Sequence, residues 1–169
     1  RVWIDDDEYR ARAVVLAMGA EHKKLGVPGE EELGGRGVSY CATCDAAFFA
    51  GKDCMIVGGG DSAMEEAIFL AKFASKVTIV NRRNEFRASK IMIDKARANP
   101  KIAWRVNAEV VEIKDTGKGE VTSMLLRDVV TGEKSEVPVA GVFVAIGHTP
   151  NTALFKGTLE LDAGGYIVT

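Results

Sequence analysis

Short apolar runs separated by a helical pattern dominate the middle of the chain. An apolar run at residues 54–57 has the length of a buried strand, and a similar run fills residues 76–80. Between them, apolar residues recur at helical spacing over residues 63–73. A strand, a glycine turn, a helix and a second strand make the first half of a dinucleotide-binding unit. The pattern therefore predicts an α/β fold built on a parallel sheet.

The pattern after this unit predicts a second helix at residues 88–98 and a third parallel strand at residues 102–106. Alternating apolar and polar residues then predict an antiparallel meander with strands at 108–113, 121–127 and 135–139 and turns at 116–119 and 131–133. The all-apolar run at 141–147 is expected to return to the parallel sheet. We therefore predict a Rossmann-like three-layer parallel sheet with an antiparallel β-meander crossover.

Both ends of the chain read as strands. Residues 2–4 and 9–17 are predicted to be two strands joined by the acidic turn 5–8, and the apolar part at 13–17 is expected to be buried. Residues 165–169 are again strand-like. Because such runs need neighbours, we expect the chain to be an internal piece of a longer protein. Residues 21–37 form a charged, glycine-rich connector.

Composition narrows the function classes. The 169 residues are 47% hydrophobic with a net charge of −2, which is enough apolar material for a full core. The basic residues form no extended cluster, and no apolar run approaches the roughly 20 residues of a membrane span. We expect neither a nucleic-acid nor a membrane partner. Since no secretory signal pattern is present, a cytoplasmic location is expected.

The glycine turn after the first strand carries the first candidate site. Gly58 allows a sharp turn off the strand, and Gly60 lacks the Cβ that would keep a pyrophosphate from the backbone. Ala63, in place of a third glycine, allows close helix–strand packing. The helix N-terminus offers free N–H groups to an anion. The turn predicts binding of a dinucleotide, and a glycine turn without a ligand is the alternative.

The end of the second strand decides which dinucleotide. An acidic residue is usual there when the ribose 2′-hydroxyl is free. This chain instead has Arg82, Arg83 and Arg87. A guanidinium binds a 2′-phosphate through charge-assisted hydrogen bonds, each contributing about 1.5–3 kcal/mol. The arginines favour NADPH over NADH, and a solvated basic turn is the alternative.

Cys41 and Cys44 form the one C-x-x-C pair of the sequence. A zinc site would need further ligands, which the sequence does not supply near the pair, so we expect no metal site. Two inert buried cysteines are a second interpretation. A redox dithiol beside a nicotinamide-binding unit is the interpretation that we favour, with Asp45 as proton donor to the leaving thiolate. Cys54, inside a predicted strand, reads as a core residue.

These motifs, in this order, resemble those of low-molecular-weight thioredoxin reductase. The likeness covers nearly the whole chain and rests on Cys-Ala-Thr-Cys-Asp at 41–45, Gly-Gly-Gly-Asp-Ser-Ala-Met-Glu-Glu-Ala at 58–67, Asn-Arg-Arg at 81–83, Phe-Arg-Ala at 86–88, and residues 142–151. The sequence departs from the family at Asn81, where histidine is usual, and at 46–47, where a glycine-bearing sequence is usual.

The resemblance implies a disulfide reductase that takes electrons from NADPH through FAD to the cysteine pair and on to thioredoxin. Cys44 would face the flavin, Cys41 would attack thioredoxin, and Asp45 would be the general acid. The implied cofactor-binding residues are Gly58, Gly59, Gly60, Asp61, Ser62, Glu65, Arg82, Arg83, Arg87, Ile146 and Gly147. Of these, Glu65 or its neighbour Glu66 would lie near the nicotinamide.

The resemblance also implies a division of the chain. Residues 1–20 would end a first FAD-domain segment, residues 21–147 would form the NADPH domain, and residues 148–169 would start a second FAD-domain segment. We expect this piece to bind NADPH, to lack FAD and to be inactive alone, and the full-length parent to be a homodimer. The alternatives are the reductase subunit of a peroxiredoxin system and an NADP(H)-binding module without redox turnover.

Overall fold

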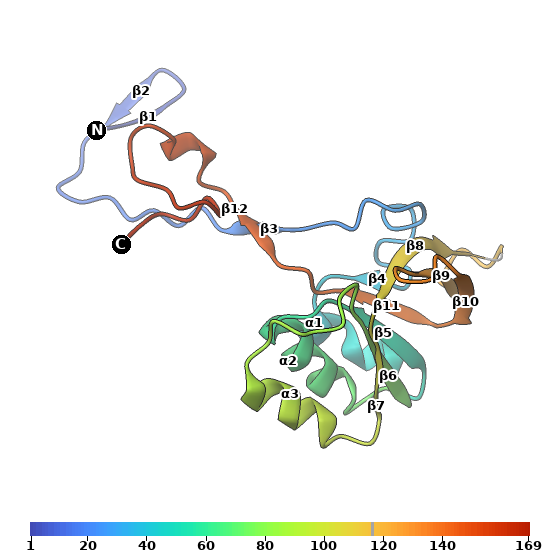
Figure 1. Cartoon of the computed structure of the whole chain (residues 1–169). Helices are drawn as coiled ribbons and strands as arrows, with labels where there is room; N and C mark the ends of the chain where they lie inside the picture. Colours follow the sequence, from blue (N-terminus) through green and yellow to red (C-terminus); the bar gives the residue numbers. More distant parts are fainter. Residues whose placement is uncertain (116) are drawn as a thin grey trace. The chain divides into compact units, whose positions relative to one another are not determined.

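The computed structural model describes residues 1–115 and 117–169, which form two compact units (Figure 1). One unit contains residues 1–21 and 149–169, and the other contains residues 22–148.

A five-stranded parallel sheet is the centre of the 22–148 unit. Its spatial order is β4 (Val38–Ser39), β11 (Gly141–Val144), β5 (Asp53–Val57), β6 (Lys76–Val80) and β7 (Ile102–Arg105). Each neighbouring pair of strands is parallel. The predicted parallel sheet is therefore confirmed, with the two-residue edge strand β4 added to it. That strand is too short to show a pattern of alternating residues.

Helices cover one face of this sheet (Figure 1). They are α2 (Asp61–Leu70), α3 (Lys90–Arg97) and the short α1 (Ala42–Asp45), which continues as the 3-10 helix η1 (Ala46–Phe49). Side chains of alternate strand residues, such as Ile56 and Ile79, pack with the helices. The helix predicted at 63–73 is offset, because α2 starts with Asp61 and ends at Leu70.

The antiparallel meander covers the other face. It consists of β8 (Ala108–Lys114), β9 (Ser123–Asp128) and β10 (Lys134–Pro138), with β9 in the middle. Met55 and Val57 point to this side and share a core with Met124 and Leu126. The predicted three-layer arrangement is confirmed. The turn predicted at 116–119 includes residue 116, which lies outside the described residues.

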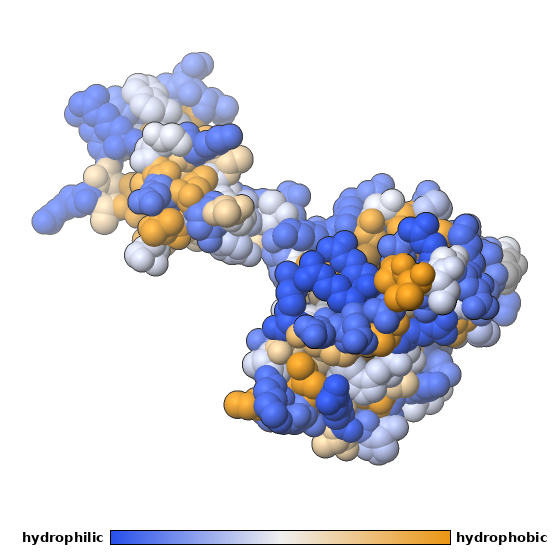
Figure 2. All heavy atoms as spheres, in the orientation of Figure 1, coloured by the Kyte–Doolittle hydropathy of each residue, from blue (hydrophilic) through white to orange (hydrophobic). Residues whose placement is uncertain are grey.

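The unit formed by residues 1–21 and 149–169 holds a hairpin of β1 (Val2–Ile4) and β2 (Asp7–Tyr9) and the 3-10 helix η2 (Ala153–Phe155). The short strands β3 (Ala20–His22) and β12 (His148–Pro150) pair where the chain passes between the units. Hydrophobic residues gather on the face of this unit seen in Figure 2. None of its described residues is buried.

Two expectations for the chain ends are wrong. Residues 13–17 form no strand, and Val15 is 89% exposed. No described strand pairs with this run, so it has no hydrogen-bonded ladder and no face to bury. Residues 165–169 form no strand either, although Ile167 makes a single bridge to Leu161. Among the described residues, no helix has the length and apolar character needed to span a bilayer.

Candidate active site

The glycine turn between β5 and α2 is held by close contacts. A Cβ at Gly58 would lie 2.3 Å from the carbonyl oxygen of Ala145, and a Cβ at Gly59 would lie 2.7 Å from Oδ1 of Asn81. At Gly60, the residue before α2, a Cβ would meet nothing within 4 Å. The first two glycines are therefore needed for packing, whereas the third faces open space at the start of the helix. That space is where an anion would meet the N–H groups of α2.

A cleft of about 590 Å³ opens beside this turn. Eight of the predicted cofactor-binding residues line it: Gly58, Gly59, Gly60, Ser62, Arg82, Arg87, Ile146 and Gly147. Four polar lining residues were not predicted as cofactor-binding: Lys23, Lys24, Asn81 and Glu109. The lining thus carries four basic side chains and one acidic side chain, a balance that favours an anionic ligand.

The other three predicted cofactor residues, Asp61, Glu65 and Arg83, are not among the residues that line the cleft. The carboxylate of Asp61 accepts hydrogen bonds from the backbone N–H and the hydroxyl of Ser89, at 2.7 and 2.9 Å. Asp61 therefore joins the start of α2 to the start of α3. Glu65 and Arg83 are both exposed.

Asn81 shapes the loop that carries the arginines. Its side chain is 8% exposed, and its Nδ2 donates to the carbonyl oxygens of Arg83 and Glu85, both at 3.0 Å. The loop also returns to the glycine turn, because the N–H of Arg87 donates to the carbonyl of Gly59 at 2.8 Å. The glycine turn and the arginine loop therefore form one connected structure.

The structure joins the sulfurs of Cys41 and Cys44 in a disulfide that bridges the first turn of α1. Cys44 is exposed and Cys41 is half-buried. The hydroxyl of Thr43 donates to Sγ of Cys41 at 3.3 Å, because a disulfide sulfur has no proton of its own. Among the described residues, no group of three or more His, Cys, Asp or Glu side chains is placed to hold a metal ion. A disulfide bond can accept two electrons.

Asp45 directly follows the pair, and a buried serine orients it. The hydroxyl of Ser39 donates to Oδ2 of Asp45 at 2.6 Å, and the backbone N–H of Cys41 donates to the same hydroxyl oxygen at 3.1 Å. Ser39 is 5% exposed. One serine therefore connects the carboxylate to the backbone of the first cysteine. Ser39 lies on a strand too short to be predicted.

A second carboxyl group approaches the disulfide from α2. Glu66 accepts a hydrogen bond from the backbone N–H of Ala42, the residue after Cys41. Burial raises the pKa of Glu66 to about 7, and the hydrogen bond from Ala42 opposes this rise. Among the described residues, Oε2 of Glu66 has no hydrogen-bond partner although it is buried. Glu66 thus faces the dithiol loop, and it is not one of the residues lining the cleft.

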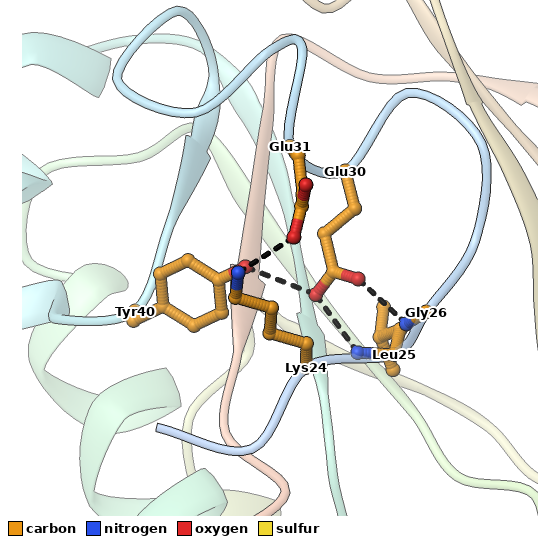
Figure 3. Close-up of polar contacts among 6 residues, drawn as sticks. All are labelled: Lys24, Leu25, Gly26, Glu30, Glu31 and Tyr40. Atoms are coloured by element: carbon orange, nitrogen blue, oxygen red, sulfur yellow. Dashed lines mark hydrogen bonds and ion pairs between the residues drawn. The ribbon is translucent and has the colours of Figure 1, made fainter. Parts of the chain in front are cut away.

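A buried carboxylate braces the segment that precedes the dithiol (Figure 3). Glu30 is 1% exposed and accepts hydrogen bonds from the backbone N–H groups of Leu25 and Gly26 and from the hydroxyl of Tyr40. Burial, followed by the hydrogen bond to Glu30, raises the pKa of Tyr40 to about 12. Tyr40 therefore stays neutral and keeps its proton for Glu30. The network holds the connector against the residue before Cys41.

The buried third cysteine is separate from this chemistry. Cys54 is 2% exposed on β5 and packs in the core on the helix side of the sheet. Burial raises the pKa of its thiol to about 12. A thiol with such a pKa carries almost no thiolate near neutral pH, so Cys54 is chemically inert there.

The sequence matches a known family of oxidoreductases. Residues 4–169 match the family model of the pyridine nucleotide-disulphide oxidoreductases. The chain therefore belongs to this family, whose members couple a nicotinamide nucleotide to a disulfide, as the name states.

Within the family, the chain resembles thioredoxin reductases, as its motifs predict. It is 57% identical to thioredoxin reductase of Mycolicibacterium smegmatis over 98% of this chain and 53% of that protein. It is 52% identical to the bifunctional thioredoxin reductase/thioredoxin of Mycobacterium leprae over 99% of this chain and 36% of that protein. Lactococcus lactis thioredoxin reductase superposes with a TM-score of 0.87 at 41% identity, over 98% of this chain and 54% of that chain. The chain thus spans about half the length of the first relatives that it matches.

Proposed function

We propose that this chain is the NADPH-binding and dithiol part of a thioredoxin-disulfide reductase. The observation that carries the proposal is that a basic, glycine-walled cleft and the Cys41–Cys44 disulfide belong to the same compact unit of residues 22–148. The similarity to proteins named thioredoxin reductase supports it. NADPH and FAD, when bound, supply the electron pair that the disulfide accepts.

The residues of the cleft fit NADPH. The volume of the cleft, about 590 Å³, lies in the usual range of small-molecule sites, and the open space at Gly60 leaves room for a pyrophosphate. Gly60 and Ser62 would hold the pyrophosphate, and Arg82 and Arg87 would hold the 2′-phosphate. Ile146 and Gly147 would line the nicotinamide end. Arg83 would act through the loop or through its charge, because it is not among the lining residues.

The described residues do not fit FAD in the same way. The unit of residues 1–21 and 149–169 buries no side chain, so it offers no enclosed wall for a flavin ring. We propose that residues 1–20 and 148–169 belong to the FAD domain of a homodimeric full-length protein and that 21–147 is its NADPH domain. Gly19 and Gly147 have φ values of +69° and +105°, a conformation that suits glycine hinges between these domains.

The cysteine pair would transfer its electrons by thiol–disulfide exchange. Once the pair is reduced, the Cys41 thiolate attacks a sulfur of the thioredoxin disulfide, forming a mixed disulfide and releasing one thioredoxin thiolate. Cys44 then attacks the Cys41 sulfur, so that the original disulfide re-forms and thioredoxin leaves as a dithiol. Asp45, oriented by Ser39, would hold the proton that the leaving thiolate needs.

Nucleotide preference tests the cleft. Calorimetric titration of the 169-residue chain is expected to show at least tenfold tighter binding of NADPH than of NADH, since one charged contact contributes about 1.5–3 kcal/mol. Arg82→Ala should lose most of this preference, whereas Arg83→Ala is the matched control on the same loop and should lose less. Equal affinities for the two nucleotides would contradict the proposal.

Partner trapping tests the dithiol without any flavin. After chemical reduction and removal of the reductant, the Cys44→Ser chain should form a stable mixed disulfide with a single-cysteine thioredoxin whose sulfur is activated as a mixed disulfide with an aromatic thiol. The aromatic thiolate leaves, and neither protein then has a second active-site thiol that could resolve the product. The Cys41→Ser chain should not, if Cys41 is the attacking thiol. Failure of both variants, together with exchange with a peroxidase-system protein, would favour the peroxiredoxin alternative. A yellow, flavin-containing 169-residue chain that turns over NADPH would contradict the proposed division of domains.

A further inference from the structure

Glu66 is the one glutamate for which the structure shows a buried carboxyl oxygen without a partner among the described residues. It follows Ala63 by one helical turn, on the side of α2 that packs against α1. Ala42 and Ala63 are both fully buried, and their small size lets the two helices approach closely. The carboxyl group of Glu66 thus reaches the backbone of the dithiol loop.

The contact lies within the disulfide ring. The N–H group that donates a hydrogen bond to Glu66 belongs to Ala42, which lies between Cys41 and Cys44. Cys41 occupies the N-cap position of α1, but its side chain makes no capping hydrogen bond. Glu66, from another helix, supplies an acceptor for an N–H group that would otherwise lack one at the start of the helix. The loop geometry and the state of this carboxyl group are therefore connected.

We propose that Glu66 is a positioning residue of the Cys41–Cys44 couple, holding the loop through Ala42 and taking up a proton from solvent when the disulfide is reduced. This inference rests on the proposed function only in treating the pair as a redox couple. Two electrons from a thiol reductant break the sulfur–sulfur bond, one sulfur takes a proton, and the other remains a thiolate. The new negative charge beside Glu66 disfavours its carboxylate form, so the carboxyl group binds a second proton.

No charged side chain around Glu66 shifts its pKa, which is set mainly by burial. The charged or titratable groups on the elements packed against α2 are Asp45 on α1, Lys90, Asp94, Lys95 and Arg97 on α3, Asp53 and Cys54 on β5, and Lys76 on β6. The pKa of Glu66 in the disulfide form, about 7, arises from burial and from Ala42, and no charged side chain is among its causes. A thiolate in the dithiol loop would therefore add a charge effect to a pKa that no charged side chain shifts in the disulfide form.

The proton uptake predicts a pH dependence of the redox equilibrium. The 169-residue chain is equilibrated with reduced and oxidised dithiothreitol from pH 5.5 to pH 9, and the thiols are trapped by alkylation and counted by mass. Above about pH 7, the equilibrium constant for reduction should fall by up to one additional factor of ten per pH unit compared with Glu66→Gln. The glutamine retains an oxygen for the Ala42 N–H but binds no proton. Glu133→Gln, an exposed site on a meander turn, is the control and should match the unmodified chain.

The outcomes are distinguishable. Equal pH slopes for the unmodified chain and Glu66→Gln would overturn the role of Glu66 and leave the proposed function intact. A pair that cannot be reduced reversibly would overturn both. If Glu66→Gln does not fold, NMR of the unmodified chain with ¹³C-labelled glutamate carboxyl groups decides. The Glu66 resonance should then titrate at higher pH in the reduced chain, and an unchanged titration overturns the inference.

Discussion

Replacing Asn81 by alanine should separate the stability of the arginine loop from its charge. The Asn81 side chain donates two hydrogen bonds of 3.0 Å to loop carbonyls and is 8% exposed. A hydrogen bond of this kind contributes about 0.5–1.5 kcal/mol, so the loss of both lowers the free energy of unfolding by about 1–3 kcal/mol. Arg82 and Arg87 retain their charge in this variant but lose the support of the loop that presents them.

Two assays follow the effect. Urea denaturation should show a lower midpoint for Asn81→Ala, and calorimetry should show that NADPH loses more affinity than NADH. Asn99→Ala is the control: its Oδ1 accepts one hydrogen bond, from Lys101 N–H at 3.0 Å, and it is not among the cleft residues. It should lower stability by less and leave the nucleotide preference unchanged. An Asn81→Ala chain with unchanged stability and unchanged preference for NADPH would refute the reasoning.

Gly59→Ala should destabilise the fold, because its Cβ would lie 2.7 Å from the hydrogen-bonded Asn81, whereas Gly60→Ala should fold normally and bind NADPH more weakly; urea melts and calorimetry compare the two. Burial raises the pKa of Glu66 from its ordinary value of 4.5 to about 7 in the folded chain, so its stabilising contribution is present below about pH 4.5 and is lost as the pH rises through 7. At pH 8, Glu66→Gln should therefore raise the free energy of unfolding by about 1–2 kcal/mol, after allowance for the partial exposure of the side chain, and so raise the urea midpoint. At pH 5 this gain in stability should be smaller. A difference in stability that does not change with pH would contradict the reasoning. Cys54 should resist a thiol reagent in the folded chain and react once in urea, whereas reaction in the folded chain would show that the core opens.

The fold of the 22–148 unit could be predicted well because its strands carry their own pattern. Residues 54–57 alternate between the two faces, with Ile56 packing on the helices and Val57 on the meander, so both faces had to be covered. The run at 13–17 is similarly apolar, but no described strand pairs with it. Hydrophobicity alone does not distinguish a strand that has partners from a segment that lacks them.

The candidate site was predicted in part for a similar reason. Backbone features near in sequence, such as the glycine turn, could be recognised from spacing. The sequence gives no reason to distinguish the adjacent residues Arg82 and Arg83, yet the loop places Arg82 in the cleft lining and Arg83 outside it. Glu66 was not predicted to face the dithiol, because its contact with Ala42 depends on how α2 packs against α1. Only tertiary structure supplies that information.

The 22–148 unit begins and ends at neighbouring backbone positions, since the N–H of Lys23 donates to the carbonyl of Gly147 at 2.9 Å. The two ends of this unit are therefore adjacent, as in a domain that is inserted into a loop of another domain. Such an arrangement permits excision, transplantation into another scaffold, or relocation of the termini to the meander turn at 131–133, at little entropic cost. The buried core of the 22–148 unit would stay intact in each case, because all of its buried residues lie within this one stretch of chain.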